Sequence, residues 1–165
     1  MTMFCRADIT IGLPRHLLWS LITDANARNL WQPDIIVAKL ESGYGGGKGS
    51  RVTMEAKDGR NTIKVSEHVI RSRVQDSFVA VQSWPKHQIH NKFILTVESE
   101  DTTNLTLQKR YKGQMRFALL GKQLTRRQLE TSATQELLGI QNLSAQLHSR
   151  MAEQSIAASN EEPNK

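Results

Sequence analysis

The longest helical pattern in the chain lies near its C-terminus, between Leu124 and Met151. At 100° per residue, its apolar side chains fall within one arc about 120° wide. The side chains in this arc are Leu129, Ala133, Leu137, Ile140, Leu143, Leu147 and Met151. Because arginine, glutamine and threonine occupy the other side, we predict an amphipathic helix that lies across another layer of the protein. The interior glycine Gly139 suggests a kink or a close approach within this helix.

Seven shorter segments show the apolar and polar alternation of half-buried strands. They cover residues 4–11, 35–42, 51–56, 62–70, 77–84, 90–98 and 105–111. Two short helices, at 14–23 and 27–31, follow the first strand, and a tight turn at Asp58-Gly59 marks one hairpin. We therefore predict an α+β fold in which a curved antiparallel sheet of about seven strands grips the long helix. We expect residues 1–151 to form one domain and residues 152–165 to be a disordered tail.

Composition fits a single globular domain. The chain has 165 residues, of which 38% are hydrophobic and 23% charged, and its mean hydropathy is −0.47. No run of 18 apolar residues and no signal-peptide pattern is visible, so neither a transmembrane segment nor secretion is predicted. The single cysteine, Cys5, fits a reducing cytoplasm. No histidine or cysteine cluster has the spacing of a metal site, and we predict neither metal nor cofactor.

The net charge of +6 is concentrated in one segment, residues 109–127. Its cations are Lys109, Arg110, Lys112, Arg116, Lys122, Arg126 and Arg127, with no acidic residue among them. Such a segment can attract an anionic partner. It lacks the interleaved aromatic residues of a single-strand platform and any helix-turn-helix or zinc-finger spacing, so the pattern does not favour nucleic acid as the partner.

The N-terminal third resembles the START-like or Bet v 1-like superfamily (SRPBCC), which includes polyketide cyclase/dehydrase-like proteins. The resemblance rests on residues 9–24 with Trp19, on the second helix ending Trp31-Gln32-Pro33, and on the glycine-rich loop that ends at Ser50. It extends over residues 3–151 and implies a helix-grip fold with a cavity for hydrophobic small molecules between the sheet and the last helix. The paired-histidine and carboxylate motif of the superfamily's Rieske-type oxygenases is not reproduced, so the resemblance implies no metal.

Candidate functional residues are polar side chains that share an apolar face. Strict alternation places Glu67, Asn91 and Lys109 toward the interior, and it also turns Val81 inward. Glu136 lies near the edge of the apolar arc of the long helix. The predicted ligand-binding set is Met54, Glu67, Val81, Asn91, Phe93, Leu107, Tyr111, Leu137 and Ile140.

These residues support three hypotheses about function. The first, which we favour, is non-catalytic binding or transfer of a hydrophobic or amphipathic small molecule. The second is a polyketide cyclase/dehydratase-like enzyme in which buried Glu67 or Glu136, with a raised pKa, transfers a proton. The third is an interaction module that uses the basic 109–127 surface. The sequence specifies neither the ligand nor the oligomeric state.

Overall fold

The computed structural model describes residues 2–113 and 126–160 of the chain, with side chains described to residue 158. In chain order the elements are β1 (Thr2–Ile11), α1 (Arg15–Thr23), the 3-10 helix η1 (Ala25–Ala27), α2 (Arg28–Trp31), β2 (Ile35–Ser42), β3 (Arg51–Asp58), β4 (Asn61–Arg73), β5 (Ser77–Trp84), β6 (His87–Ser99), β7 (Thr102–Gly113) and α3 (Arg126–Asn160). Every predicted strand and helix is present. Most observed strands are a few residues longer than the alternation indicated.

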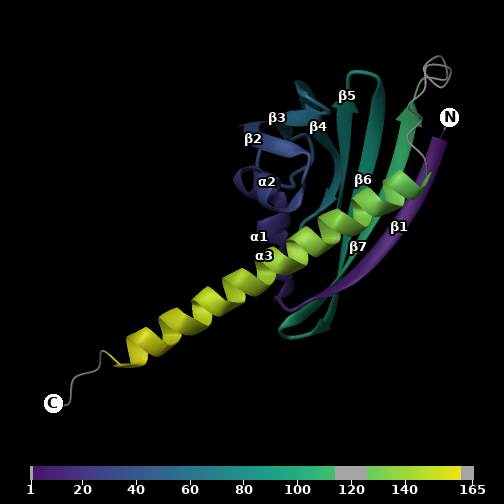
Figure 1. The fold of residues 1–165 in the computed structure, drawn as a ribbon. Helices are drawn as coiled ribbons and strands as arrows, with labels where there is room; N and C mark the ends of the chain where they lie inside the picture. Colours follow the sequence, from purple (N-terminus) through teal and green to yellow (C-terminus); the bar gives the residue numbers. More distant parts are fainter. Residues whose placement is uncertain (1, 114–125, 161–165) are drawn as a thin grey trace.

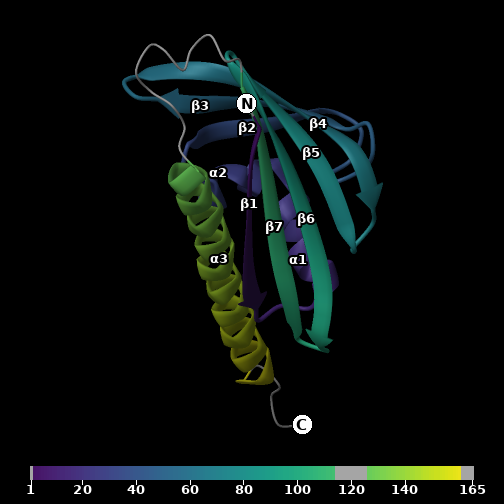
Figure 2. The same ribbon diagram turned by 90° about the vertical axis from the view of Figure 1, so that its right-hand side faces the viewer.

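The seven strands form one antiparallel sheet in the order β1-β7-β6-β5-β4-β3-β2. The sheet curves around α3, which runs beside β1 and β7, and α1 and α2 lie on the same concave side (Figures 1 and 2). This arrangement confirms the predicted α+β helix-grip fold. It gives the sheet a concave face that packs against helices and an outer face on which none of the described helices lies (Figures 1 and 2).

The two prolines near the N-terminus position the short helices. Pro14 precedes α1, and its carbonyl oxygen accepts hydrogen bonds from the backbone N–H groups of Leu17 and Leu18. Gln32, which precedes Pro33, has an extended conformation and ends α2, because the residue before a proline disfavours helical dihedral angles. The chain therefore leaves α2 directly into β2.

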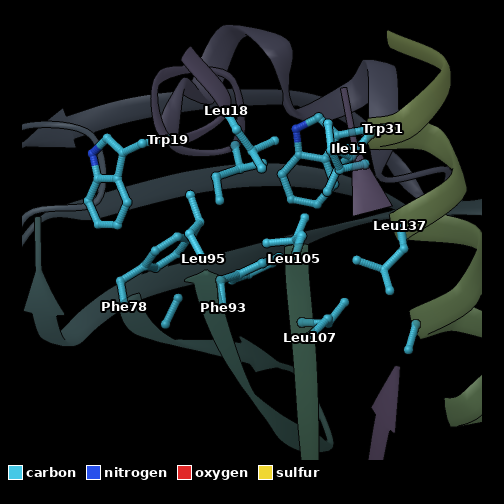
Figure 3. Packing of buried hydrophobic residues seen from close by; sticks show 14 of the residues in the cluster. Ile11, Leu18, Trp19, Trp31, Phe78, Phe93, Leu95, Leu105, Leu107 and Leu137 are labelled. Carbon is cyan, nitrogen blue, oxygen red and sulfur yellow. The ribbon is translucent and has the colours of Figure 1, made fainter. Parts of the chain in front are cut away.

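The main hydrophobic core lies between the concave face, α1 and α3. Phe78 and Phe93 stack at 4.8 Å between ring centroids, and Trp19 and Trp31 meet them edge-on at 5.5 and 6.0 Å (Figure 3). Leu105, Leu107, Leu137 and Ile140 fill the space around these rings. A second, smaller cluster under β2, β3 and β4 contains Ala25, Ile35, Ala38, Val52, Met54, Ala56 and Val65.

Gly139 lies where α3 passes close to the backbone of α2 at Trp31. A Cβ atom at this position would lie 2.6 Å from the carbonyl oxygen of Trp31 and 2.9 Å from its Cα. Both contacts are with backbone atoms, which cannot rotate away as a flexible side chain can. Of the two interpretations offered by the sequence, the structure supports the close approach.

The C-terminal helix continues nine residues beyond its predicted end at Met151, to Asn160. Residues 152–160 are therefore helical, and the prediction that they are disordered is wrong. Their composition explains this, because alanine, glutamate and glutamine extend a helix that is already nucleated even without an apolar face to bury. The remainder of the predicted tail, residues 161–165, lies outside the described residues.

Candidate functional site

A row of buried polar side chains crosses the concave face. Cross-strand pairing places Glu67 opposite Gln82 and Asn91 opposite Lys109, and Gln82 and Asn91 are diagonal neighbours on β5 and β6. Three further polar side chains face this row from the helices. We call the whole set the interior polar belt: Glu67, Gln82, Asn91 and Lys109 from the sheet, Arg28 and Gln32 from α2 and its C-terminal end, and Glu136 from α3. Each is at most 5% exposed.

The first ion pair of the belt joins α2 to β4. The Arg28 guanidinium donates two hydrogen bonds to the Glu67 carboxylate, both 2.8 Å long, and Gln82 Nε2 donates a third at 2.9 Å. Burial by itself would raise the pKa of Glu67, but the positive charge and hydrogen bonds of Arg28 outweigh burial and hold that pKa below its ordinary value. Glu67 is therefore an ionised acceptor. It does not have the raised pKa that a proton-transfer role requires.

The second ion pair joins α3 to β7. Lys109 Nζ donates to Glu136 Oε1 at 2.7 Å, and Ser132 Oγ donates to the same oxygen at 3.3 Å. Gln32 connects the two pairs, since its Nε2 donates to Glu136 Oε1 at 3.4 Å and its Oε1 accepts from Gln82 Nε2 at 3.5 Å. Two cations and two anions thus neutralise each other inside the belt.

Several polar atoms of the belt have no hydrogen-bond partner among the described residues. Three are acceptor oxygens, Gln82 Oε1, Asn91 Oδ1 and Glu136 Oε2, and the fourth is the donor nitrogen Nε of Arg28. A buried acceptor without a donor costs free energy, and native proteins leave few of them. These three oxygens can accept hydrogen bonds from a polar group that enters between the sheet and α3.

Beyond the belt, the concave face ends in half-buried apolar and aromatic side chains. We call this the aromatic end: Met3, Ile63, Trp84, His87, Ile89 and Tyr111. The His87 ring stacks on Trp84 at 5.5 Å and lies 5.0 Å from Tyr111. Burial lowers the pKa of His87, only partly opposed by Asp58, and so favours the uncharged imidazole. The aromatic end is thus an apolar surface in partial contact with water.

Two hollows lie away from the space between the sheet and α3. One, of about 690 Å³, opens at β2 to β5, where Lys39, Thr53, Lys64 and Ser66 line it together with Met54 and Trp84. The other, of about 530 Å³, lies between the end of α1, η1 and the edge strand β2. No residue of α3 lines either hollow. The region of the predicted cavity instead holds the main core and the interior polar belt.

Comparisons with known proteins agree on the fold. The Zhui aromatase/cyclase from Streptomyces sp. R1128 superposes with a TM-score of 0.70 at 14% identity, covering 88% of this chain and 94% of that one. Ara h 8.0201 superposes with a TM-score of 0.67 at 12% identity, covering 88% of this chain and 99% of that one. A START superfamily protein from Mycobacterium smegmatis superposes with a TM-score of 0.65 at 12% identity, covering 91% of this chain and 97% of that one. The fold is START-like. No protein-family model and no curated protein sequence matches the chain.

Most predicted ligand-binding residues lie on the inner side of this START-like sheet or on α3. Phe93, Leu107, Leu137 and Ile140 belong to the main core. Met54 lies in the second cluster, Glu67 and Asn91 lie in the belt, and Tyr111 lies at the aromatic end. Their role in binding remains a prediction.

The inward orientation predicted for Val81 is wrong. Phe78, Ala80 and Gln82 are the buried residues of β5, each at most 2% exposed, so Val81 faces outward between them. Apolar residues occupy both faces of this strand, so alternation alone allowed either orientation. The error concealed Gln82, which a correct orientation would have placed next to Glu67.

Sequence patterns did not reveal Arg28 and Gln32. They lie on and just after a helix of four residues, Arg28–Trp31, which is too short to show a periodic apolar pattern. Burial of both polar side chains results from the packing of α2 against β2 and α3. The one available signal was an arginine three residues before a tryptophan in a short helix, and Arg28 does lie over the Trp31 ring at 5.0 Å.

The basic 109–127 segment does not form one surface. Lys109 is 1% exposed and belongs to the interior belt, whereas Arg110 and Lys112 are exposed on the outer face. Successive side chains of a strand point to opposite faces, which separates Lys109 from its neighbours. Arg126 and Arg127 lie in the first turn of α3, and Arg116 and Lys122 lie outside the described residues.

The structure also bears on metal binding and on membrane insertion. Within residues 2–113 and 126–160, no group of three or more histidine, cysteine, aspartate or glutamate side chains is placed to hold a metal ion. Among the described helices, none has the length and apolar character needed to cross a membrane.

Proposed function

We propose that the chain binds, and transfers, a hydrophobic or amphipathic small molecule on the concave side of its sheet. The apolar body of this ligand contacts the aromatic end, and its polar group reaches the interior polar belt. The observation that carries the proposal is the adjacency of these two surfaces. Trp84 on β5 and Tyr111 on β7 each lie two residues from a belt residue, Gln82 and Lys109 respectively, on the same face.

The aromatic end supplies the apolar contact. Its six side chains are half-buried, and cross-strand pairing places Tyr111 beside Met3 and Ile89, and Trp84 beside His87, so the rings adjoin one another across neighbouring strands. A ligand that covers the Trp84, His87 and Tyr111 rings removes apolar area from water, worth roughly 25 cal/mol per Å². Burial of this area supplies the main driving force.

The belt favours a particular polar group. Because its two ion pairs neutralise each other, the belt offers no net charge to balance a ligand carboxylate or ammonium group. It does offer the unpartnered acceptors of Gln82, Asn91 and Glu136. An uncharged hydroxyl or N–H group that donates to one of them satisfies a buried acceptor at no charge penalty.

The enzymatic alternative is now restricted to one carboxylate. The lowered pKa of Glu67 and its two bonds to Arg28 leave it unsuited to proton transfer. Glu136 keeps one oxygen, Oε2, without a partner among the described residues. A polyketide cyclase/dehydratase-like reaction in this chain would therefore use Glu136, and we regard it as the second candidate function.

Binding can be measured with the uncharged probe N-phenyl-1-naphthylamine, which combines an aromatic body with a single N–H donor. Its fluorescence should rise and saturate when the protein is added. Trp84→Ala should weaken this binding by about tenfold or more, equivalent to at least about 1.4 kcal/mol, because it removes the largest ring of the aromatic end.

The matched control is Val81→Ala, which trims an apolar side chain on the same strand but on the outer face. It should leave the dissociation constant of the probe unchanged. Thermal unfolding of both variants checks that each remains folded. An absence of saturable binding, or equal losses in the two variants, would contradict the proposed site.

A further inference from the structure

The outer face of the sheet carries a second chemical pattern, assembled from six strands. Cross-strand pairing aligns Phe4, Arg110, His90, Val81, His68 and Arg51 in one row from β1 to β3. The adjacent row contains Arg6, Gln108, Lys92, Val79 and Arg71. Lys112 lies at the start of the row on the other side, opposite Thr2 and Gln88. Neither of the two complete rows contains an acidic residue.

Five cations of this surface are available to a partner. Arg51, Arg71, Lys92, Arg110 and Lys112 are exposed, and no ion pair joins any of them to an acidic side chain within the described part of the chain. Arg6 is different, because Asp8 pairs with it at 3.1 Å. We call these five residues the outer basic surface. They account for five of the 22 lysine and arginine residues in a chain whose net charge is +6.

Ring-bearing side chains lie between these cations. His90 pairs across the strands with Arg110, and His68 pairs with Arg51. Phe4, 47% exposed, stands beside Arg110 on β1. The positive field is large enough to affect His90, whose pKa is lowered by burial and by the charges of Lys112 and Arg110. The alternation of cations with ring-bearing side chains is absent from the 109–127 sequence read by itself, because strands from different parts of the chain create it.

We propose that the outer basic surface binds single-stranded nucleic acid. The inference goes beyond the proposed function, since the surface lies on the face of the sheet opposite the belt and the aromatic end. Strands in a sheet are about 4.8 Å apart, so the row from Phe4 on β1 to Arg51 on β3 spans about 24 Å. Over this length the cations contact successive phosphates, and Phe4, His68 and His90 offer flat surfaces on which bases stack.

The shape of the face favours a flexible strand over a membrane. The sheet curves toward α3, so its outer face is convex (Figure 2). A planar bilayer touches a convex surface over a small area, whereas a single strand can follow the curvature across neighbouring β-strands. The outer side chains of β5 that lie among the cations, Val79 and Val81, are half-buried and offer little apolar surface for insertion into lipid.

The test is fluorescence anisotropy of a labelled 12-nucleotide oligouridine, titrated with the full chain at several salt concentrations. Wild-type protein should bind, with log affinity falling linearly against log salt concentration. Replacing three cations of the surface (R71Q/K92Q/R110Q) should weaken binding by about 100-fold at 0.1 M salt and make the salt slope shallower by about 2, since each phosphate contact in a single strand contributes about 0.7.

A matched variant separates the surface from overall charge. K48Q/R60Q/R150Q removes the same charge from three exposed positions outside the outer basic surface, and it should reduce affinity far less. A duplex of the same length and vesicles of phosphatidylcholine with phosphatidylglycerol serve as competitors. Absence of oligouridine binding, equal losses in the two triple variants, or vesicle binding that depends on the surface and that oligouridine does not displace would each overturn the proposal.

Discussion

Replacing Arg28 with methionine should lower the free energy of unfolding by about 3–5 kcal/mol. The change leaves the Glu67 carboxylate, 3% exposed, with the Gln82 amide as its one remaining direct donor among the described side chains. An ionised carboxylate buried without its counter-ion has lost both water and the compensating charge. Urea denaturation followed by circular dichroism gives the free energy. A loss below about 1 kcal/mol would show that the ion pair contributes little to the folded state.

Two further variants and a pH series identify the cause of this loss. Arg28→Lys keeps the charge but not the bidentate geometry and should lose less. The double variant R28M/E67L removes both charges and should recover much of the stability. Because the folded-state pKa of Glu67 lies below its ordinary value of 4.5, the pair stabilises the fold above that pH and less as pH falls through the folded-state pKa. The difference between wild type and Arg28→Met should therefore shrink in acid.

Gly139→Ala should also destabilise the protein, by about 1–3 kcal/mol. In an ordinary helix this substitution is favourable by about 1 kcal/mol. Here the new methyl group would lie 2.6 Å from the Trp31 carbonyl oxygen, so α2 must move away from α3. That movement separates Gln32 from Glu136 on α3, and the same variant should therefore also weaken binding of N-phenyl-1-naphthylamine.

Gly12→Ala is the matched control for this prediction. A Cβ atom at Gly12 would have no heavy atom within 4 Å, and the φ angle of this residue is not positive, so the substitution meets open space. Its effect on the free energy of unfolding should be neutral or slightly stabilising. Equal effects of the two glycine substitutions would show that the crossing of α2 and α3 is loosely packed and can absorb a methyl group.

The arrangement of the fold could be predicted because the periodicity of apolar residues identifies the strands and the long helix and shows which face of each is buried. The apolar arc from Leu129 to Ile140 is buried on α3 in the structure, and the alternation of Glu67 with Val65 and Val69 correctly turned that carboxylate inward. In these segments one face is clearly apolar, so only one orientation buries it. Short hairpin connections then fix which strands are neighbours.

The candidate site was only partly predictable, because its partners are brought together by tertiary packing. The interaction of Glu67 with Arg28 spans 39 residues, and that of Glu136 with Gln32 spans 104. No local pattern encodes either contact. Val81 was misoriented because β5 has apolar residues on both faces, and the outer-face row from Phe4 to Arg51 depends on the register of six strands.

The thiol of Cys5 can be used to measure how often α3 separates from β1. This thiol is 3% exposed, and its Sγ donates a weak hydrogen bond of 3.6 Å to the carbonyl oxygen of Leu129 in the first turns of α3. Burial raises the pKa of the thiol, so little reactive thiolate forms while α3 is in place. Since the chain has a single cysteine, its rate of alkylation measures how often the helix lifts from β1.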